Sequence, residues 1–388
     1  MSPALPETLV AGLPAVLADA LDVAPAALRI ERLQRLSGGA SQETWAFEAV
    51  WGAPPAAMPA ALPAALQADS PGTPSVDLLN DLPTDAPNAG RRALILRRAP
   101  PGVAERASEG VGLAGEAVLI RLAAAAGVPV PAVVAVLQPA HGLGEGFIMQ
   151  RLPGETLGRR LASAARPTLA RQCGEALARI HALPLDRLPP LRAAQPRAEV
   201  DHLRAWHARH GTAKPVFQLS LRWLAERAPA DGPPALVHGD FRNGNLMADL
   251  AVPGGALVGV LDWELAYLGD PMADLGWLCV NAWRFGQPQR PVGGFGQLAE
   301  LFDGYRAAGG TLDAARVHWW QVLGTLRWGV ICESMGHAWA SGAEPVMEKA
   351  AIGRRASETE IDLLDLLAPR AASALQPGAA SSSLHGAT

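Results

Sequence analysis

HGDFRNGN, residues 238–245, is the stretch of this 388-residue chain on which the predicted fold depends. Asn245 follows Asp240 by five positions, and an apolar segment, residues 257–261, ends immediately before Asp262. Phosphoryl transfer requires few protein groups: a carboxylate that orients and deprotonates the attacking hydroxyl, oxygen ligands for a metal ion, and cations beside the phosphates. Asp240 is the candidate carboxylate, and the oxygens of Asn245 and Asp262 are hard ligands suited to Mg²⁺. Arg242, two positions after Asp240, is the candidate cation for the phosphoryl group.

The same residues also have a simpler explanation. Asp and Asn are common in turns because their side chains hydrogen-bond to nearby backbone groups, so Asp240 or Asn245 alone would be assigned to an ordinary turn. The five-residue spacing, together with Asp262 at the end of an apolar strand, favours the catalytic explanation.

Composition excludes several classes of protein. The net charge is −4 and hydrophobic residues make up 49% of the chain, which argues against a nucleic-acid partner, an anionic membrane surface and global disorder. The longest apolar stretch, residues 122–137, contains Gly127 and two prolines and is too short to span a bilayer, and the N-terminus lacks the pattern of a signal peptide. We therefore expect a cytoplasmic protein with no membrane and no nucleic-acid partner, and nothing in the sequence predicts its oligomeric state.

The first 150 residues have the pattern of a small α+β lobe. Alternation of apolar and polar residues predicts strands, and helical spacing predicts one helix that stops at Gly127. The predicted strands are 30–36, 44–50, 93–97, 132–137 and 146–150, and the predicted helix is 113–126. Residues 52–90 are rich in Ala and Pro without usable periodicity, which predicts a mobile insertion. Residues 1–150 are thus predicted to form a nucleotide-binding N-lobe with an antiparallel sheet.

After Gly154 helical patterning dominates the chain. Apolar positions recur at helical spacing in four stretches, 157–165, 169–181, 200–210 and 271–368, and a β-rich interval, 235–262, interrupts them. Residues 369–388 are of low complexity and are predicted to be a disordered tail. Residues 151–368 are therefore predicted to form a mostly helical C-lobe that carries the catalytic loop, the metal site and the acceptor pocket.

HGDFRNGN and the segment LDWE at 261–264 together resemble the catalytic and metal-binding motifs of the aminoglycoside phosphotransferase and choline kinase superfamily. Three further segments make the sequence most similar to the phosphotransferase domains associated with acyl-CoA dehydrogenases. They are LDWELAYLGDPMADLGWLC at 261–279, WRFG at 283–286 and TLRWG at 325–329. The resemblance covers residues 28–368 and implies a protein-kinase-like fold of two lobes.

This resemblance implies roles for individual residues. Asp240 would be the catalytic residue, Asn245 and Asp262 would hold Mg²⁺, and His238 would support the loop rather than act as a base. The implied cofactors are ATP and Mg²⁺, and the implied partner is a small molecule with a hydroxyl group. The resemblance to the dehydrogenase-associated domains points to hydroxy-acid or hydroxyacyl compounds.

The segment around Asp270 and Asp274 has a scaffold role in both explanations. From the residues alone, Asp270 can cap a helix, Pro271 suits its first position, and Asp274 in the first turn favours the helix dipole. The resemblance implies that an Asp in this segment braces the catalytic loop by accepting its backbone N–H groups.

A glycine-rich turn lies where the resemblance implies a phosphate-covering loop. Its backbone N–H groups and hydroxyls can meet phosphate oxygens, although an ordinary hairpin turn explains it equally well in isolation. The candidate residues of this loop are Ser37, Gly38, Gly39 and Ser41.

Arg97 and Glu116 match the positions of the nucleotide-anchoring Lys and its carboxylate partner in the family. Arg in place of Lys keeps the charge but changes the geometry, and Arg98 is the competing candidate. A surface strand charge and a solvated helix acid explain the same residues equally well. Gln150 and Leu152 join the lobes, where backbone groups would meet the adenine edge.

The acceptor side is predicted from scattered residues. Trp283 and Arg284 follow a predicted helix, Arg327 lies on a later helix, and Glu264 follows Asp262 by two positions; all four are candidates for substrate binding. The remaining tryptophans at helical spacing are predicted to be core residues: Trp277, Trp319, Trp320 and Trp328.

The predicted function is the transfer of a phosphoryl group from ATP to a hydroxyl of a small metabolite. A kinase-like nucleotide-binding or scaffold protein with weak catalysis is the alternative, because Arg97 replaces the usual Lys. An aminoglycoside or choline-type kinase is disfavoured, because a polycation requires an acidic pocket and the C-terminal acids are scattered. A protein kinase is disfavoured because the segment between Asp262 and Asp270 is too short for an activation segment.

Overall fold

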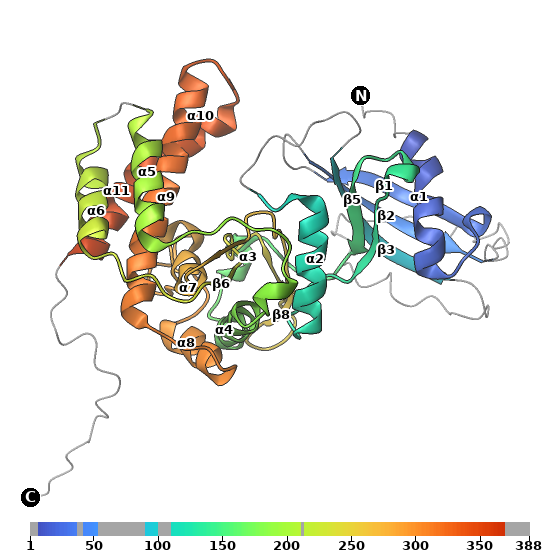
Figure 1. The fold of residues 1–388 in the computed structure, drawn as a ribbon, viewed down its shortest axis with the longest axis horizontal. Helices are drawn as coiled ribbons and strands as arrows, with labels where there is room; N and C mark the ends of the chain where they lie inside the picture. Colours follow the sequence, from blue (N-terminus) through green and yellow to red (C-terminus); the bar gives the residue numbers. More distant parts are fainter. Residues whose placement is uncertain (1–6, 37–41, 53–89, 100–109, 211–212, 369–388) are drawn as a thin grey trace, which may run out of the picture.

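The computed structural model describes residues 7–36, 42–52, 90–99, 110–210 and 213–368. A sheet with two helices forms the N-terminal lobe, and a mostly helical lobe follows after residue 150 (Figure 1). The predicted two-lobe α+β architecture is confirmed. The predicted phosphate-covering loop, nearly all of the 52–90 insertion and the C-terminal tail lie outside the described residues.

Five antiparallel strands form the N-terminal sheet, in the order β1-β2-β3-β5-β4. They are β1 (Leu28–Leu36), β2 (Glu43–Trp51), β3 (Gly90–Ala99), β4 (Val133–Val136) and β5 (Glu145–Gln150). β2 and β3 pair along their whole length, from Glu43 opposite Arg98 to Trp51 opposite Gly90. Residues 52–90 therefore connect two directly paired strands.

A helix that was not predicted from the sequence precedes the sheet. This helix is α1 (Glu7–Leu21). The described residues before β5 therefore contain two α-helices, although the sequence predicted only the one at 113–126. The buried residues Leu9, Leu13, Val16 and Leu17 of α1 recur at the spacing of one helix face, so the periodicity was present in the sequence. Pro14 inside the helix hides this signal, because proline is rare in helix interiors.

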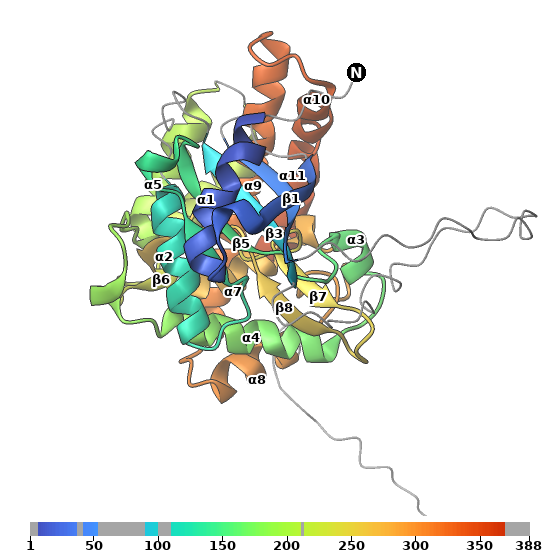
Figure 2. The ribbon, with the colours of Figure 1, turned by 90° about the vertical axis from the view of Figure 1, so that its right-hand side faces the viewer.

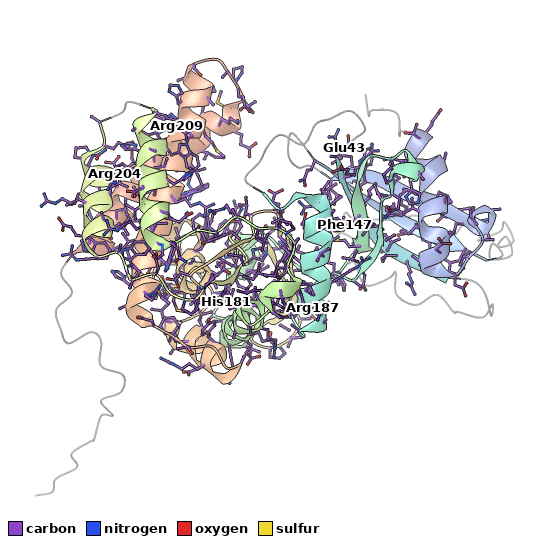
Figure 3. All side chains as sticks on the ribbon, viewed as in Figure 1. Glu43, Phe147, His181, Arg187, Arg204 and Arg209 are labelled. Atoms are coloured by element: carbon purple, nitrogen blue, oxygen red, sulfur yellow. The ribbon has the colours of Figure 1, made fainter. Side chains whose placement is uncertain are left out.

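The two N-terminal helices cover opposite faces of the sheet. Leu94 and Leu96 of β3 belong to the same core cluster as α1. Phe147 of β5 points toward α2 (Gly112–Ala125) on the other face (Figure 3). Because side chains alternate along a strand, Ile95 and Arg97 face the α2 side. This alternation decides which β3 residues reach the space between the lobes.

The C-terminal lobe combines nine described α-helices with two small two-stranded antiparallel sheets, β6–β9 and β7–β8. The helices before the strands are α3 (Gly158–Leu161), α4 (Pro167–His181), α5 (Pro196–Ala208) and α6 (Pro215–Glu226), and α7 (Met272–Leu278) directly follows them. The strands are β6 (Ala235–Val237), β7 (Leu246–Asp249), β8 (Ala256–Val260) and β9 (Tyr267–Gly269). The last helices are α8 (Leu298–Ala307), α9 (Ala314–Ala340), α10 (Met347–Gly353) and α11 (Ala356–Leu367).

Some predicted boundaries in this lobe are wrong. The helix expected over 157–165 is only α3, whose C-cap is Ala162, and Pro167 accounts only for the non-helical backbone of Arg166 before α4. The helical stretch expected over 271–368 is interrupted by a long loop between α7 and α8, which contains only a short turn, Asn281–Trp283. α6 is an additional helix that was not identified from the sequence.

α9 is the central helix of the C-terminal lobe. Asp313 caps its N-terminus by accepting hydrogen bonds from the backbone N–H groups of Ala315 and Arg316, both at 3.0 Å. It contacts α5, α6, α7, α10 and α11. α4 and α8 pack against each other below it (Figures 1 and 2), with Gly174 directly against the backbone of Leu301. α7, which contacts both α9 and α4, thus connects these helices behind the loop that follows β6.

Across the residues that the structure describes, no helix has both the length and the apolarity needed to cross a bilayer.

Candidate active site

Residues 238–245, called the catalytic segment for their predicted role, connect β6 to β7. Its first two backbone N–H groups, those of His238 and Gly239, donate to the two carboxylate oxygens of Asp274 on α7, at 2.8 and 3.0 Å. His181 on α4, labelled in Figure 3, lies 3.2 Å from the same carboxylate and 2.9 Å from the hydroxyl of Tyr305. The segment is therefore fixed from α7, with α4 and α8 behind it.

The side chain of His238, the first residue of this segment, is completely buried. Its ring packs against Trp263, with centroids 4.7 Å apart, and Nδ1 accepts a hydrogen bond from the backbone N–H of Asp240 at 3.3 Å. Burial lowers the pKa of His238 below its usual value, which favours the neutral ring. The contacts are those of a supporting residue.

Asp240 presents a carboxylate that three donors hold in place. Oδ1 accepts from Nε of Arg242 at 2.8 Å and from Nε1 of Trp277 at 2.9 Å. Oδ2 accepts from Nδ2 of Asn245 at 2.7 Å. These bonds fix both the rotamer and the plane of the carboxylate.

Asn245 and Asp262 lie side by side although they come from different strands. The backbone N–H of Leu261, one residue before Asp262, donates to the carbonyl of Asn245 at 2.8 Å. Asp262 adopts a left-handed conformation (φ 65°), which ends the extended chain after β8. Both residues line the nucleotide cleft described below. The amide nitrogen of Asn245 is used by Asp240, so its amide oxygen is the atom suited to a cation.

The described residues contain no group of three or more His, Cys, Asp or Glu that could hold a metal ion by themselves. A Mg²⁺ site in a phosphotransferase does not require such a group, because water and substrate phosphates supply most of the ligands. The oxygens of Asn245 and Asp262 fit this type of site.

Arg97 is the hub of a buried charge cluster between the lobes. Its Nη1 lies 3.1 Å from Glu116 on α2 and 3.0 Å from Asp262, and its Nη2 lies 3.6 Å from Glu264. Nη2 also donates to Oε1 of Gln42 at 3.0 Å. Within the described residues, Nε of Arg97 and Oε2 of Glu116 are buried without a hydrogen-bond partner. The structure thus brings the two predicted anchor residues together and adds Asp262 to them.

Glu116 is almost completely buried in this cluster. Burial raises its pKa to about 7, against the attraction of Arg97, and the negative charge of Asp262 acts in the same direction as burial. Burial and Asp262 also raise the pKa of Glu264. One guanidinium therefore faces three carboxyl groups.

Arg98 lies on the opposite face of the sheet from Arg97. Its Nε donates to Glu43 at 3.0 Å, and its Nη1 donates to the carbonyl of Leu143 at 3.0 Å. It contacts nothing in the cleft, since it points toward the α1 side. The alternation along β3 separates the two candidate anchors.

The cleft between the sheet and the catalytic segment, called the nucleotide cleft only for its predicted role, has a volume of about 560 Å³. Its lining includes Arg97, Glu116, Gln150, Leu152, Gly244, Asn245 and Asp262. At the connection between the lobes, the backbone N–H groups of Gln150 and Arg151 donate to Ala132 and Ala93. The next backbone donor along the chain is that of Leu152. A volume of this size is in the range of small-molecule sites.

A second cavity of about 520 Å³ lies on the other side of Arg242. Its lining includes Arg242, Asn281, Trp283, Phe285, Trp328, Arg355 and Asp362. The guanidinium of Arg242 lies 4.6 Å from the centroid of the Trp283 ring, and its Nη1 donates to the carbonyl of Asn243. The predicted phosphate cation therefore lies on the wall of the second cavity, between it and Asp240.

The other candidate substrate residues lie apart from Trp283. Arg284 donates to the carbonyls of Cys279 and Pro288 at 2.7 and 3.1 Å. Arg327 stacks on Trp277 at 5.3 Å and lines two small cavities of about 20 and 50 Å³ behind the catalytic segment. Glu264 faces Arg97. The structure thus places only Trp283 of these four on the second cavity.

The contacts of Asp270 are those of a structural residue. Oδ1 accepts from the backbone N–H of Met272, the first residue of α7, at 3.0 Å, so Asp270 caps this helix although the helix begins one residue later than Pro271. Oδ2 accepts from Nε of Arg316 and Nε1 of Trp320, both at 2.8 Å. Asp274, not Asp270, contacts the catalytic segment.

Sequence reasoning missed two residues of the site. Trp277 was predicted to be core; it is buried, but its indole N–H donates to Asp240. Gln42 contacts Arg97. The signal for Trp277 was its position three residues after Asp274, on the same face of a helix.

A family model described as "Phosphotransferase enzyme family" matches residues 87–310. The match covers more than half of the chain, which therefore belongs to this family. The resemblance stated from the motifs is confirmed.

Two curated relatives carry the names of dehydrogenases. "Acyl-CoA dehydrogenase family member 10" of Mus musculus is 29% identical over 199 residues, which are 49% of this chain and 18% of that protein. "Probable acyl-CoA dehydrogenase IBR3" of Arabidopsis thaliana is 28% identical over 206 residues, 48% of this chain and 24% of that protein. The matched region thus spans about a fifth of the length of these relatives.

Solved structures show the same fold. A Ralstonia eutropha JMP134 protein assigned to the aminoglycoside phosphotransferases has a TM-score of 0.63 at 17% identity, over 92% of this chain and 97% of that one. A choline/ethanolamine kinase family protein from Mesorhizobium loti has a TM-score of 0.53 at 21% identity, over 91% and 94%. Aminoglycoside phosphotransferase APH(4)-Ia, in a complex with AMP-PNP and hygromycin B, has a TM-score of 0.52 at 17% identity, over 92% and 99%.

Proposed function

We propose that this protein is a small-molecule kinase that transfers the γ-phosphate of ATP, with Mg²⁺, to a hydroxyl group. The observation that carries the proposal is that Asn245 and Asp262 line the cleft together with Arg97 and Glu116, and that Asn245 also hydrogen-bonds to the carboxylate of Asp240 at 2.7 Å. These are the groups that phosphoryl transfer requires, and few others are needed.

Each of these residues has a role that follows from its contacts. Asp240 orients the acceptor hydroxyl and takes its proton. Asn245 and Asp262 would hold Mg²⁺, which when bound neutralises charge on the phosphates. Arg97, held by Glu116, binds the nucleotide phosphates from the sheet side. The backbone of Gln150 and Leu152 binds the base. The phosphate-binding role of Ser37, Gly38, Gly39 and Ser41, which lie outside the described residues, stays a prediction from the sequence.

The nucleotide is proposed to be ATP. One structural relative was solved with AMP-PNP, and another, a kanamycin complex of an aminoglycoside phosphotransferase with a TM-score of 0.55, was solved with GDP. ATP and GTP are therefore both to be assayed as phosphate donors, and the expected result is a lower KM for ATP than for GTP.

The acceptor is proposed to enter the second cavity and to be a hydroxy-acid or hydroxyacyl compound. The ring of Trp283 lies under Arg242, and the ring of Trp328 lies under Arg355 at 5.5 Å. These aromatic faces are already covered by cations, which disfavours a cage for choline or an aminoglycoside ammonium group. The names of the curated relatives also favour an acyl-type acceptor. A cytoplasmic location remains a prediction from the sequence.

A screen of purified protein tests this function. ATP or GTP with Mg²⁺ would be supplied with hydroxy-acids, hydroxyacyl thioesters, choline and kanamycin, and release of nucleoside diphosphate and phosphorylated product would be measured. Transfer to a hydroxy-acid or hydroxyacyl compound is expected, with loss of turnover but not of nucleotide binding in Asp240→Asn. Asp303→Asn, an exposed acid on α8, is the matched control and should keep full activity.

The second candidate is a kinase-like protein that binds nucleotide without turnover. The ion pair between Arg97 and Asp262 favours it, because it engages the carboxylate that Mg²⁺ would need. Nucleotide binding without transfer to any compound of the panel would select this candidate.

A further inference from the structure

α7 presents two side chains to the catalytic segment from one face. Asp274 accepts the backbone N–H groups of His238 and Gly239, and Trp277, three residues further on, donates its indole N–H to the side chain of Asp240. Residues three apart on a helix are neighbours on its surface. One helix therefore holds both the backbone and the reactive side chain of the catalytic segment.

The two oxygens of Asp240 differ in the number of donors that they accept. Oδ1 accepts from Trp277 at 2.9 Å and from Arg242 at 2.8 Å, whereas Oδ2 accepts only from Asn245 among the described side chains. A carboxylate oxygen offers about two lone-pair sites. The two donors fill those of Oδ1, so Oδ2 is the oxygen with a site left for a further hydrogen.

The indole of Trp277 is packed on three sides. Its ring packs edge-on against Trp283 at 5.2 Å and under the guanidinium of Arg327 at 5.3 Å. On the α9 side it lies against the backbone at Gly324, where an added Cβ would come within 3.0 Å of the ring. A donor held on three sides fixes the direction of its hydrogen bond.

We propose that Trp277 is a positioning residue that turns the carboxylate of Asp240 so that Oδ2 takes the proton of the acceptor hydroxyl. This inference rests on the proposed function. In the step, the acceptor oxygen bonds to the γ-phosphorus and the bond from that phosphorus to the bridging oxygen breaks. ADP leaves with the bridging oxygen, and the hydroxyl proton moves to Oδ2.

The test is Trp277→Phe, which removes the N–H donor and keeps an aromatic ring. With the acceptor found in the screen, kcat is expected to fall about tenfold, which corresponds to about 1.4 kcal/mol, while the KM for ATP stays unchanged. The KM for the acceptor is also expected to stay unchanged, because the phenyl ring keeps the packing and only the hydrogen bond to Oδ1 is lost. A purely structural role would lower the melting temperature without this selective loss of kcat.

Trp319→Phe is the matched control. Trp319 is as deeply buried, and its indole N–H donates to the carbonyl of Leu224 at 3.2 Å, away from both cavities. The same chemical change there should lower thermal stability without lowering kcat. Equal kcat values for wild type and Trp277→Phe would overturn the inference and leave the proposed function standing.

A second measurement needs neither turnover nor a folded Trp277 variant. In a ¹H–¹⁵N spectrum of the full chain, one of the eleven indole N–H signals is expected to move strongly on Asp240→Asn. A spectrum in which no indole signal moves overturns the inference. If an indole signal moves on Asp240→Asn but the wild-type chain transfers phosphate to no acceptor, the proposed function is overturned, and with it the role of Oδ2.

Discussion

Replacing Arg97 by alanine is expected to raise the KM for ATP about tenfold to a hundredfold. A hydrogen bond to a charged group contributes about 1.5–3 kcal/mol, and each 1.4 kcal/mol is a factor of ten in affinity. Arg97 is the β3 arginine that faces the nucleotide cleft, and Glu116 and Asp262 hold its Nη1 at 3.1 and 3.0 Å. Loss of this guanidinium therefore removes a prepositioned phosphate contact.

Arg98→Ala is the matched control because it removes the same side chain from the next position. Arg98 pairs with Glu43 and with the carbonyl of Leu143 on the α1 side of the sheet. Its loss leaves Glu43 without this partner, so thermal stability should fall while the KM for ATP stays close to that of wild type.

The assay is steady-state ADP release at fixed Mg²⁺, with nucleotide binding measured separately by calorimetry. The expected order of KM is Arg97→Ala well above Arg98→Ala, and Arg98→Ala close to wild type. The reverse order would refute the assignment and move the anchor one residue along the strand.

Three other changes to the chain have expected outcomes. Glu116→Gln should flatten the pH dependence of stability. The Glu116 carboxyl keeps its proton up to about pH 7 in the folded chain but loses it near pH 4.5 in the unfolded chain. The free energy of unfolding of wild type therefore falls by about 3 kcal/mol as the pH rises between these values. Urea unfolding at pH 5 and pH 8 measures this difference in the free energy of unfolding. An equal difference between the two pH values for variant and wild type would contradict the prediction. Asp262→Ala should abolish the dependence of ATP affinity on Mg²⁺ in calorimetry, and an unchanged dependence would exclude Asp262 as the ligand. Deletion of residues 53–88 should leave the melting temperature and turnover nearly unchanged, because Trp51 and Gly90 are directly paired and a short turn can join them; a misfolded product would refute this.

Much of the fold was predictable because its signals are local. Alternation defined the strands of the N-terminal sheet, and glycine and proline marked the end of α2. α1 was missed because Pro14 conceals a buried face formed by Leu9, Leu13 and Val16. The loop between α7 and α8 was missed because apolar residues there are buried without helical structure, and composition does not distinguish the two cases.

The sequence by itself was enough to propose which residues carry the chemistry. Asp240, Asn245 and Asp262 are identified by residue type and spacing, because a carboxylate, an amide oxygen and a hard metal ligand are required by phosphoryl transfer whatever surrounds them.

Only the tertiary structure decided how these groups are aimed. Trp277 reaches Asp240 across 37 positions of sequence, and Arg97 meets Asp262 across 165, so no local pattern records either contact. Arg242 lies on the wall of the second cavity because Oδ1 of Asp240 and the ring of Trp283 hold its guanidinium there. Hydrogen bonds and ring contacts depend on distance and direction in space, and these are set by how α7 and α9 pack behind the catalytic segment.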